Sequence, residues 1–201
     1  MSKALDIAEN LSLLSTKYTS SSTTLDSVVL GSSTTDHASR ALTGTFSGTI
    51  GSTATFPAGH IIQTQHCSYS TETSTDSTTF VATALTKQIT MTSASNKVII
   101  MTNMAGCLKT ASDYFGAFTI YRGSTNLAAG GSGTVTNYDW MGNIQNLPAS
   151  QLSENISMCY VDTPGTGTHT YTVYYGSTSG GSVYYCVWQQ TSQMILMELA
   201  V

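Results

Sequence analysis

The C-terminal part of the chain limits the possible folds more than any other segment, because three strand-like runs follow one another there, separated by Gly/Ser turns. The runs are Thr168–Tyr175, Gly181–Trp188 and Gln193–Val201. The first alternates Thr with Tyr or Val, as a strand with one buried face does. The last is apolar on both faces, at Met194, Ile195, Leu196, Met197, Leu199 and Val201. Such a strand needs cover on both sides, which predicts either a second sheet plus a subunit neighbour or unusually deep burial.

Similar short runs begin at Pro57 and are separated by turn-forming clusters such as 93–96 and 162–167. The expected strands lie near 60–70, 78–85, 88–92, 97–105, 114–122, 134–141, 155–161, 170–175, 182–189 and 193–200. Short strands without an intervening helix predict an all-β fold, and we expect a β-sandwich of jelly-roll type.

Charge excludes one class of partner. Only 9% of the residues are charged, against about 25% in a typical protein. The chain has 7 Lys and Arg against 11 Asp and Glu, without a basic cluster. A nucleic-acid binder needs a positive surface to neutralise phosphates. We therefore expect no nucleic-acid partner.

Two further features bear on location. The sequence has no secretion signal at its start and no apolar run near the roughly 18–20 residues that a membrane helix needs, so we expect no membrane insertion. The four cysteines are widely spaced and form no C-x-x-C pair: Cys67, Cys107, Cys159 and Cys186. This spacing favours buried free thiols over disulfides or metal ligation, and it fits synthesis in a reducing cytoplasm.

The N-terminal part of the chain has a different character. Residues 3–14 form the one good helix candidate, about three turns long and too short to be stable alone. Its candidate anchoring residues are Leu5, Ile7, Ala8, Leu11 and Leu14. The following Ser/Thr/Gly-rich segment has too little apolar surface to fold by itself, so it is either a linker or a stem ordered by partners. We expect an N-terminal helix and stem over residues 1–54 and a β-sandwich knob over residues 55–201.

Several ordered blocks carry a family resemblance. They are TFPAGHIIQ at 55–63, FVATALTKQITMTSASNKVII at 80–100, FTIYRGSTNL at 118–127, YVDTPGT at 160–166 and the closing MELA. Together they resemble the carboxy-terminal domain of tail-fibre and other virion appendage proteins from phages of marine bacteria, such as cyanophages and pelagiphages. The resemblance covers about residues 55–201, and residues 1–54 match less well.

The resemblance implies a trimeric β-rich knob on a fibrous stem, made in the host cytoplasm and attached to the virion by its N-terminus. A homotrimer would also give the short helix a partner and cover the apolar last strand. The expected function is a tail fibre or fibre-like appendage that contributes to host attachment. Its partners would be itself, other virion proteins, and a host surface glycan or outer-membrane component. The alternative is a head fibre, capsid decoration or tail adaptor protein without receptor-binding activity.

Catalytic patterns are weak. No Gly-x-Ser-x-Gly elbow is present, and Gly131-Ser132-Gly133 lacks the strand-to-helix context of a nucleophile. The histidines are dispersed and lack H-E-x-x-H spacing: His37, His60, His66 and His169. Of these, His60 and His66 could approach Cys67 along one strand. The separated carboxylates fit turns and rims as easily as a glycosidase pair: Asp113, Asp139, Glu154 and Asp162. We expect no enzyme and no catalytic, cofactor or metal site, with a polysaccharide-degrading enzyme as a distant alternative.

Binding chemistry is more plausible in one stretch. Tyr138, Asp139, Trp140 and Asn143 place two aromatic rings beside a carboxylate and an amide. A sugar-binding surface needs this combination, because rings stack on C–H faces while polar groups bind hydroxyls. The alternative, which the strand pattern favours, makes Trp140 and Met141 core residues of an ordinary strand.

Overall fold

The computed structural model describes residues 57–110, 114–128, 134–145 and 153–201. The predicted helix with its anchoring residues, from Leu5 to Leu14, and the predicted stem lie outside the described residues. The boundary predicted between residues 54 and 55 lies outside them too.

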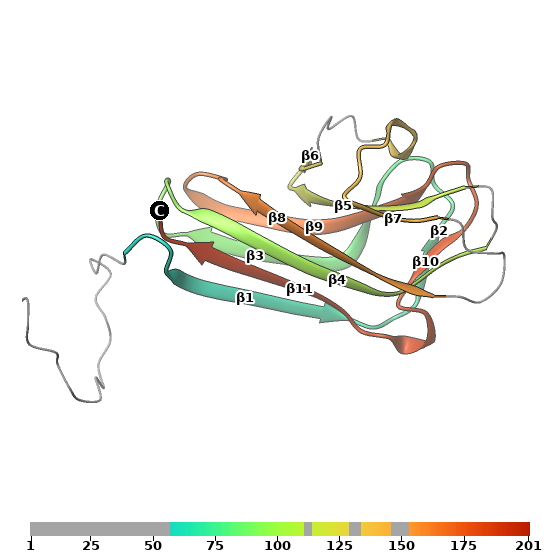
Figure 1. The fold of residues 1–201 in the computed structure, drawn as a ribbon, viewed down its shortest axis with the longest axis horizontal. Coiled ribbons are helices and arrows are strands. Elements are labelled where there is room, and N and C mark those ends of the chain that lie inside the picture. The colour runs from blue at the N-terminus through green and yellow to red at the C-terminus, as the bar shows by residue number, and fades with distance from the viewer. Residues whose placement is uncertain (1–56, 111–113, 129–133, 146–152) are drawn as a thin grey trace, which may run out of the picture. The chain divides into compact units, whose positions relative to one another are not determined.

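The described part of the chain folds into β-strands joined by turns, with two short 3-10 segments (Figure 1). The strands are β1 Ile61–Tyr69, β2 Thr73–Thr75, β3 Val81–Met91, β4 Lys97–Lys109, β5 Gly116–Arg122, β6 Thr125–Asn126, β7 Gly142–Ile144, β8 Glu154–Asp162, β9 Gly167–Ser177, β10 Val183–Tyr185 and β11 Ser192–Leu199. The 3-10 segments are η1 Val135–Asn137 and η2 Val187–Gln189. The predicted all-β class is confirmed.

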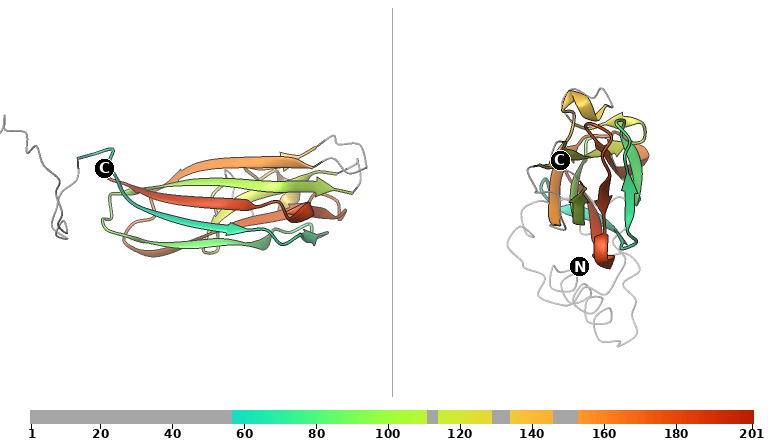
Figure 2. Two further views of the ribbon diagram at one scale, coloured as in Figure 1. Left: turned by 90° about the horizontal axis from the view of Figure 1, so that it is seen from below. Right: turned by 90° about the vertical axis from the view of Figure 1, so that its right-hand side faces the viewer.

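The strands form two sheets that stack as a sandwich (Figure 2). The first sheet has the order β1-β11-β4-β10-β2, and β8 pairs with β4 on its other side. The second sheet has the order β3-β9-β5-β6, and β7 also pairs with β5. The pairings are nested and antiparallel: β1 with β11, β3 with β9, β4 with β8, and β5 with β7. The first long strand therefore lies beside the last.

The core lies between the sheets and follows from the period of two in each strand. Alternate residues of the first sheet point inward, among them Ile100, Met104 and Leu196, and each is fully buried. Phe118 and Val173 of the second sheet meet them and are buried to the same extent. Burying one such side chain contributes roughly 1.5–3 kcal/mol, so this alternation supplies the main stabilisation of the sandwich.

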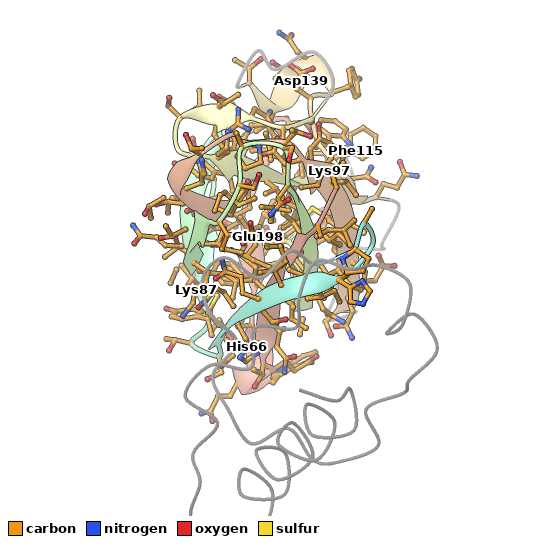
Figure 3. All side chains as sticks on the ribbon, turned by 90° about the vertical axis from the view of Figure 1, so that its left-hand side faces the viewer. His66, Lys87, Lys97, Phe115, Asp139 and Glu198 are labelled. Carbon is orange, nitrogen blue, oxygen red and sulfur yellow. The ribbon has the colours of Figure 1, made fainter. Side chains whose placement is uncertain are left out.

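A buried carboxylate ties the two sheets together at the end where β1 begins and β11 ends. Glu198 of β11 is fully buried and faces the core side of the sheet (Figure 3). Its Oε1 accepts hydrogen bonds from the Thr92 amide (2.8 Å), the Thr92 hydroxyl (2.7 Å) and Asn96 Nδ2 (2.7 Å). Its Oε2 accepts one from Gln63 Nε2 at 2.6 Å. Thr92 directly follows β3, so these bonds join β1 and β11 of the first sheet to the end of a second-sheet strand.

A second polar contact joins the sheets through Asp162 at the end of β8. Arg122 Nη1 of β5 contacts both carboxylate oxygens, at 2.8 and 2.7 Å. The hydroxyl of Tyr171 on β9 donates to Oδ2 at 2.8 Å. Burial, followed by the neighbouring carboxylate, raises the pKa of Tyr171 far above its usual value. The phenol therefore stays a donor, and the contact holds β8 onto the second sheet.

Four expected strands differ from the observed ones. The two expected near 78–85 and 88–92 are one strand, β3, whose pairing with β9 shifts register between Ala82 and Thr86. The strand expected at 134–141 is wrong: η1 and a left-handed Tyr138 (φ 62°) take its place. Only the first part of the strand expected at 182–189 forms, as β10, because Cys186 turns left-handed (φ 56°) and the chain continues into η2.

Candidate functional site

The predicted binding stretch lies beside an aromatic cluster that is separate from the main core. The cluster consists of Phe80, Ala117, Tyr121 and Val135, with Trp140 and Tyr174 partly buried against it. Tyr121 on β5 and Tyr174 on β9 stack with ring centroids 3.9 Å apart. Desolvation, followed by the nearby Tyr174 and Asp139, raises the pKa of Tyr121. The cluster thus forms a small apolar support for the chain between η1 and β7.

The four predicted binding residues have different surroundings. Tyr138 is exposed, with 69% of its surface accessible, whereas Trp140 is partly buried. Their ring centroids lie 4.9 Å apart, and the ring centroid of Phe115 lies 6.3 Å from that of Trp140. Asp139 is buried, and its backbone oxygen accepts a hydrogen bond from Asn126 at 2.9 Å.

Asn143, the last of the four, lies on β7 and is half-buried. The structure therefore brings two of the predicted residues together as an aromatic pair, Tyr138 with Trp140. Trp140 lies between η1 and β7, outside any strand and outside the main core.

A second candidate surface is the outer face of the first sheet. Cross-strand neighbours on β11, β4 and β8 form two apolar rows: Ile195, Met101 and Cys159 in one, and Met197, Ile99 and Val161 in the other. We call these six residues the apolar face. Met101 and Val161 are exposed to 46% and 52%, and Ile195, Met197 and Ile99 are half-buried.

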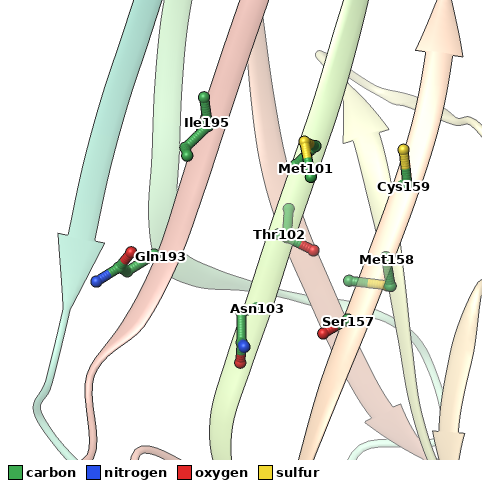
Figure 4. A pocket seen from close by; sticks show the side chains of 8 residues that line it. All are labelled: Met101, Thr102, Asn103, Ser157, Met158, Cys159, Gln193 and Ile195. Carbon is green, nitrogen blue, oxygen red and sulfur yellow. The ribbon is translucent and has the colours of Figure 1, made fainter.

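The apolar face is hollowed along β4. A depression of about 310 Å³ is lined by side chains that include Met101, Cys159 and Ile195. Figure 4 shows Met101 and Cys159 on neighbouring strands, with the polar Asn103, Ser157 and Gln193 toward one end. None of the lining residues is charged. The strand predicted to be apolar on both sides thus has one side in the core and the other on this face.

The titratable candidates for catalysis or metal binding are dispersed. His60 Nδ1 lies 3.1 Å from the Pro57 oxygen, and His169 Nε2 lies 3.1 Å from the Thr166 oxygen. His66 is exposed, whereas Cys67 beside it packs against the core. The structure does not bring His60, His66 and Cys67 into a metal-binding group, and within the described ranges no three His, Cys, Asp or Glu side chains form one. His37, Asp113 and Gly131–Gly133 lie outside those ranges.

All four cysteines are described, and all are free thiols. Cys107 and Cys186 are buried and Cys67 is half-buried, as predicted for core thiols. Burial raises the pKa values of Cys67 and Cys107. The prediction of burial is wrong for Cys159, because its position on β8 points to the outer side of the first sheet.

Sequence reasoning missed the segment around η2. Cys186, Trp188 and Gln189 have left-handed backbones, with φ of 56°, 55° and 60°, and Trp188 is 62% exposed. Non-Gly residues with such φ values are uncommon and mark sites of local strain. The run of Val, Tyr, Cys and Trp residues from 183 to 188 is typical of a strand, so the sequence predicted a strand there instead of a turn. The polar run Gln189-Gln190-Thr191 was the one feature of the sequence that indicated a turn.

Within the described residues, no helix is both long enough and apolar enough to cross a membrane. The chain matches no protein-family model, and a comparison with curated proteins found no match. The fold and the surfaces described above therefore carry the functional argument.

Proposed function

We propose that the chain is a virion structural protein: a trimeric tail fibre or fibre-like appendage, with a jelly-roll knob, that contributes to host attachment. The observation that carries this proposal is the apolar face. The resemblance to appendage proteins of marine phages supplies the biological setting. The apolar face, the strand order and the shared position of the start of β1 and the end of β11 supply physical support.

The jelly-roll part of the proposal rests on the nested pairing. Eight strands pair from the outside of the sequence inward, beginning with β1 and β11 and ending with β5 and β7. The pairs alternate between the two sheets, so the chain crosses from one sheet to the other repeatedly. A jelly roll is an eight-stranded double sheet of this kind.

The assembly part of the proposal rests on exposed apolar area. Monomeric soluble proteins rarely expose contiguous apolar patches larger than a few hundred Å². Here two rows of apolar residues from three adjacent strands are exposed or half-buried on the outer face of the first sheet, without a charged residue among them. Contact with another subunit removes such a surface from water, and a closed cyclic assembly of one chain buries the same residues in every copy. We take three copies as the assembly, as the family resemblance implies.

The attachment part of the proposal rests on where the chain enters the sandwich. The Gly59 amide donates to the Ala200 oxygen at 2.9 Å, and the Ala200 amide donates to the His60 oxygen at 2.8 Å. The start of β1 and the end of β11 therefore share one end of the sandwich. A particle attached through residues that precede β1 would leave the other end, with β2 and β10, available to a host surface.

A charge placed on the apolar face tests the assembly. We expect the full-length protein to be a trimer in mass photometry and Met101→Glu to be a monomer, because the carboxylate would have to be desolvated in the interface. The variant subunit should still fold, with a cooperative melting transition, because Met101 is 46% exposed and the substitution leaves the core of the sandwich intact. Thr90→Glu, on the exposed outer side of β3, is the matched control and should remain trimeric.

A wild-type protein that stays monomeric at micromolar concentration would contradict the proposal, as would a trimeric Met101→Glu variant. Imaging of labelled protein on particles separates a tail fibre from the alternative of a head fibre, capsid decoration or tail adaptor.

A further inference from the structure

An exposed tryptophan lies between two hollows at the end of the sandwich away from residue 57. Trp188 and Glu72 line both hollows, which measure about 340 and 510 Å³. Leu108, Thr110, Tyr184 and Val187 complete the first. Ser70, Thr71 and Gln189 complete the second. We call these residues the Trp188 surface. Tyr184 of this surface belongs to β10, and Glu72 directly precedes β2; both strands lie at the right of Figure 1.

The backbone that carries Trp188 is strained and firmly held. Three of its residues are left-handed without being glycine. The Cys186 amide donates to the Ala105 oxygen at 2.8 Å, and Cys186 Sγ lies 3.1 Å from Ser192 Oγ. Gly106 packs so closely below η2 that a Cβ there would lie 2.8 Å from the Val187 nitrogen. Strain of this kind persists only where the surroundings hold it, and it concentrates at ligand-binding sites.

The core does not require this arrangement. Val187 is buried and anchors the turn, but the Trp188 ring, 62% exposed, belongs to neither hydrophobic cluster. The fold thus holds the backbone of a large, exposed aromatic residue in one conformation, and a preorganised backbone lowers the cost of binding a ligand there.

We propose that the Trp188 surface binds a saccharide, with the indole stacking on a sugar ring and Glu72 accepting hydrogen bonds from its hydroxyls. The hollows have the size of small-ligand sites, and their linings combine aromatic, hydroxyl, amide and carboxylate groups. No cationic side chain lines either hollow, and Glu72 repels anions. The ligand class is therefore a neutral or amino sugar, not a phosphate or sulfate. Its identification as a host glycan rests on the proposed function; the binding chemistry does not.

Tryptophan fluorescence can report binding at this surface. It contains two tryptophans, so Trp140→Phe leaves Trp188 as the sole indole fluorophore in the full-length protein. The probes are the methyl glycosides of glucose, galactose and N-acetylglucosamine, titrated at millimolar concentrations. We expect at least one probe to shift the emission in wild type and in Trp140→Phe, and ligand-observed NMR to show the same binding.

Two variants at the site make the test specific. Trp188→Asn removes the ring while suiting the left-handed backbone, and Glu72→Gln removes the charge at an exposed position with little change in shape. We expect Trp188→Asn to weaken the NMR-detected affinity about tenfold or more, because a lost stacking contact has that value. Glu72→Gln should weaken it severalfold, and neither variant should change the melting temperature appreciably.

Three results would overturn the inference. The first is that no probe binds the wild-type protein. The second is that Trp188→Asn binds the probes with unchanged affinity whereas Trp140→Phe loses binding, which would place the site at the Tyr138–Trp140 pair. The third is that Trp188→Asn dissociates the trimer in mass photometry, which makes the surface a contact between copies. A persistent trimer that binds no sugar would refute this inference and leave the assembly proposal standing, whereas a monomer that binds sugar would do the reverse.

Discussion

Glu198 shows how much one residue contributes to the end of the sandwich where the chain enters. Burial alone would raise the pKa of this carboxyl group, but hydrogen bonds from Asn96, Gln63 and Thr92 outweigh burial and hold the pKa below its ordinary value of 4.5. A carboxylate with a lowered pKa stabilises the folded state above its ordinary pKa, and the contribution is lost as the pH falls through the folded value.

We therefore expect the free energy of unfolding to decrease as the pH falls below about 4.5, and Glu198→Gln to lose this part of the pH dependence. At neutral pH the variant should be less stable by about 1–3 kcal/mol, because its amide nitrogen would face a donor that now lacks an acceptor. Denaturant unfolding of both proteins between pH 3 and pH 7 measures the difference. Parallel pH profiles for wild type and variant would show that Glu198 does not titrate in this range.

Residues that lie close in the sequence were the predictable part of the candidate site. Tyr138 and Trp140 are two positions apart, so their contact could be expected from the sequence. Trp188 and Glu72 are far apart in the sequence, and they line the same hollows because β10 pairs with β2 and brings their flanking turns together. A strand register of this kind depends on tertiary packing and is not visible in either segment alone.

At the scale of elements, the alternation of apolar and polar residues predicted most strands. It failed where non-glycine residues adopt a left-handed backbone and form a turn. β9 and β11 follow their period of two closely, and the sequence predicted both. η1 and η2 replaced expected strand because Tyr138, Cys186 and Trp188 adopt left-handed backbones that their residue types do not announce. The cause lies in tertiary contacts: Val135 of η1 belongs to the outer aromatic cluster, and Val187 of η2 packs on Gly106.

Gly106 of β4 is the part of that contact most open to a test. Its φ is +59°, and an added Cβ would lie 2.8 and 2.9 Å from the Val187 nitrogen and oxygen. Gly123 has nearly the same φ, +57°, and open space around it. We expect Gly123→Ala to cost about 1 kcal/mol from backbone strain alone.

Gly106→Ala should cost clearly more, about 2–4 kcal/mol, because η2 must also move away from β4. Thermal unfolding of the two variants isolates the packing contribution by difference. Equal losses in both would mean that η2 is not pressed against β4. The indole emission of Trp188, with Trp140→Phe in the background, should change in the Gly106 variant and not in the Gly123 variant.

At the scale of the whole molecule, composition and strand pattern predicted an all-β sandwich, and the structure has one. The same reasoning predicted that the last strand needs cover on both sides, and β11 receives cover from the second sheet on one side only. Which surface lies open could not be predicted, because it depends on the strands that flank β11. Val161 and Cys159 join the apolar face through the register of β8 on β4.

Truncation tests whether residues 1–54 attach the protein to the particle and whether residues 55–201 fold without them. A protein that lacks residues 1–54 should retain a folded knob, because the core of the sandwich consists of residues after 57. It should no longer join virions, because the proposed anchoring residues between Leu5 and Leu14 are removed. Circular dichroism of the truncated protein and its incorporation during infection give the two readouts. Normal incorporation would place the attachment site in the knob.

The pairing of β1 with β11 also affects folding during synthesis. During synthesis β1 emerges from the ribosome long before its partner, and β4 lacks one neighbour until the same late moment, since β11 lies between them. The nascent chain therefore holds an unpaired edge on β1 and another on β4 until β11 has been synthesised, and open strand edges can pair with the wrong partner. Pairings between the first and last strands close slowly as well, because they join distant parts of the chain. The chain is therefore most exposed to wrong strand pairing in the interval before β11 emerges.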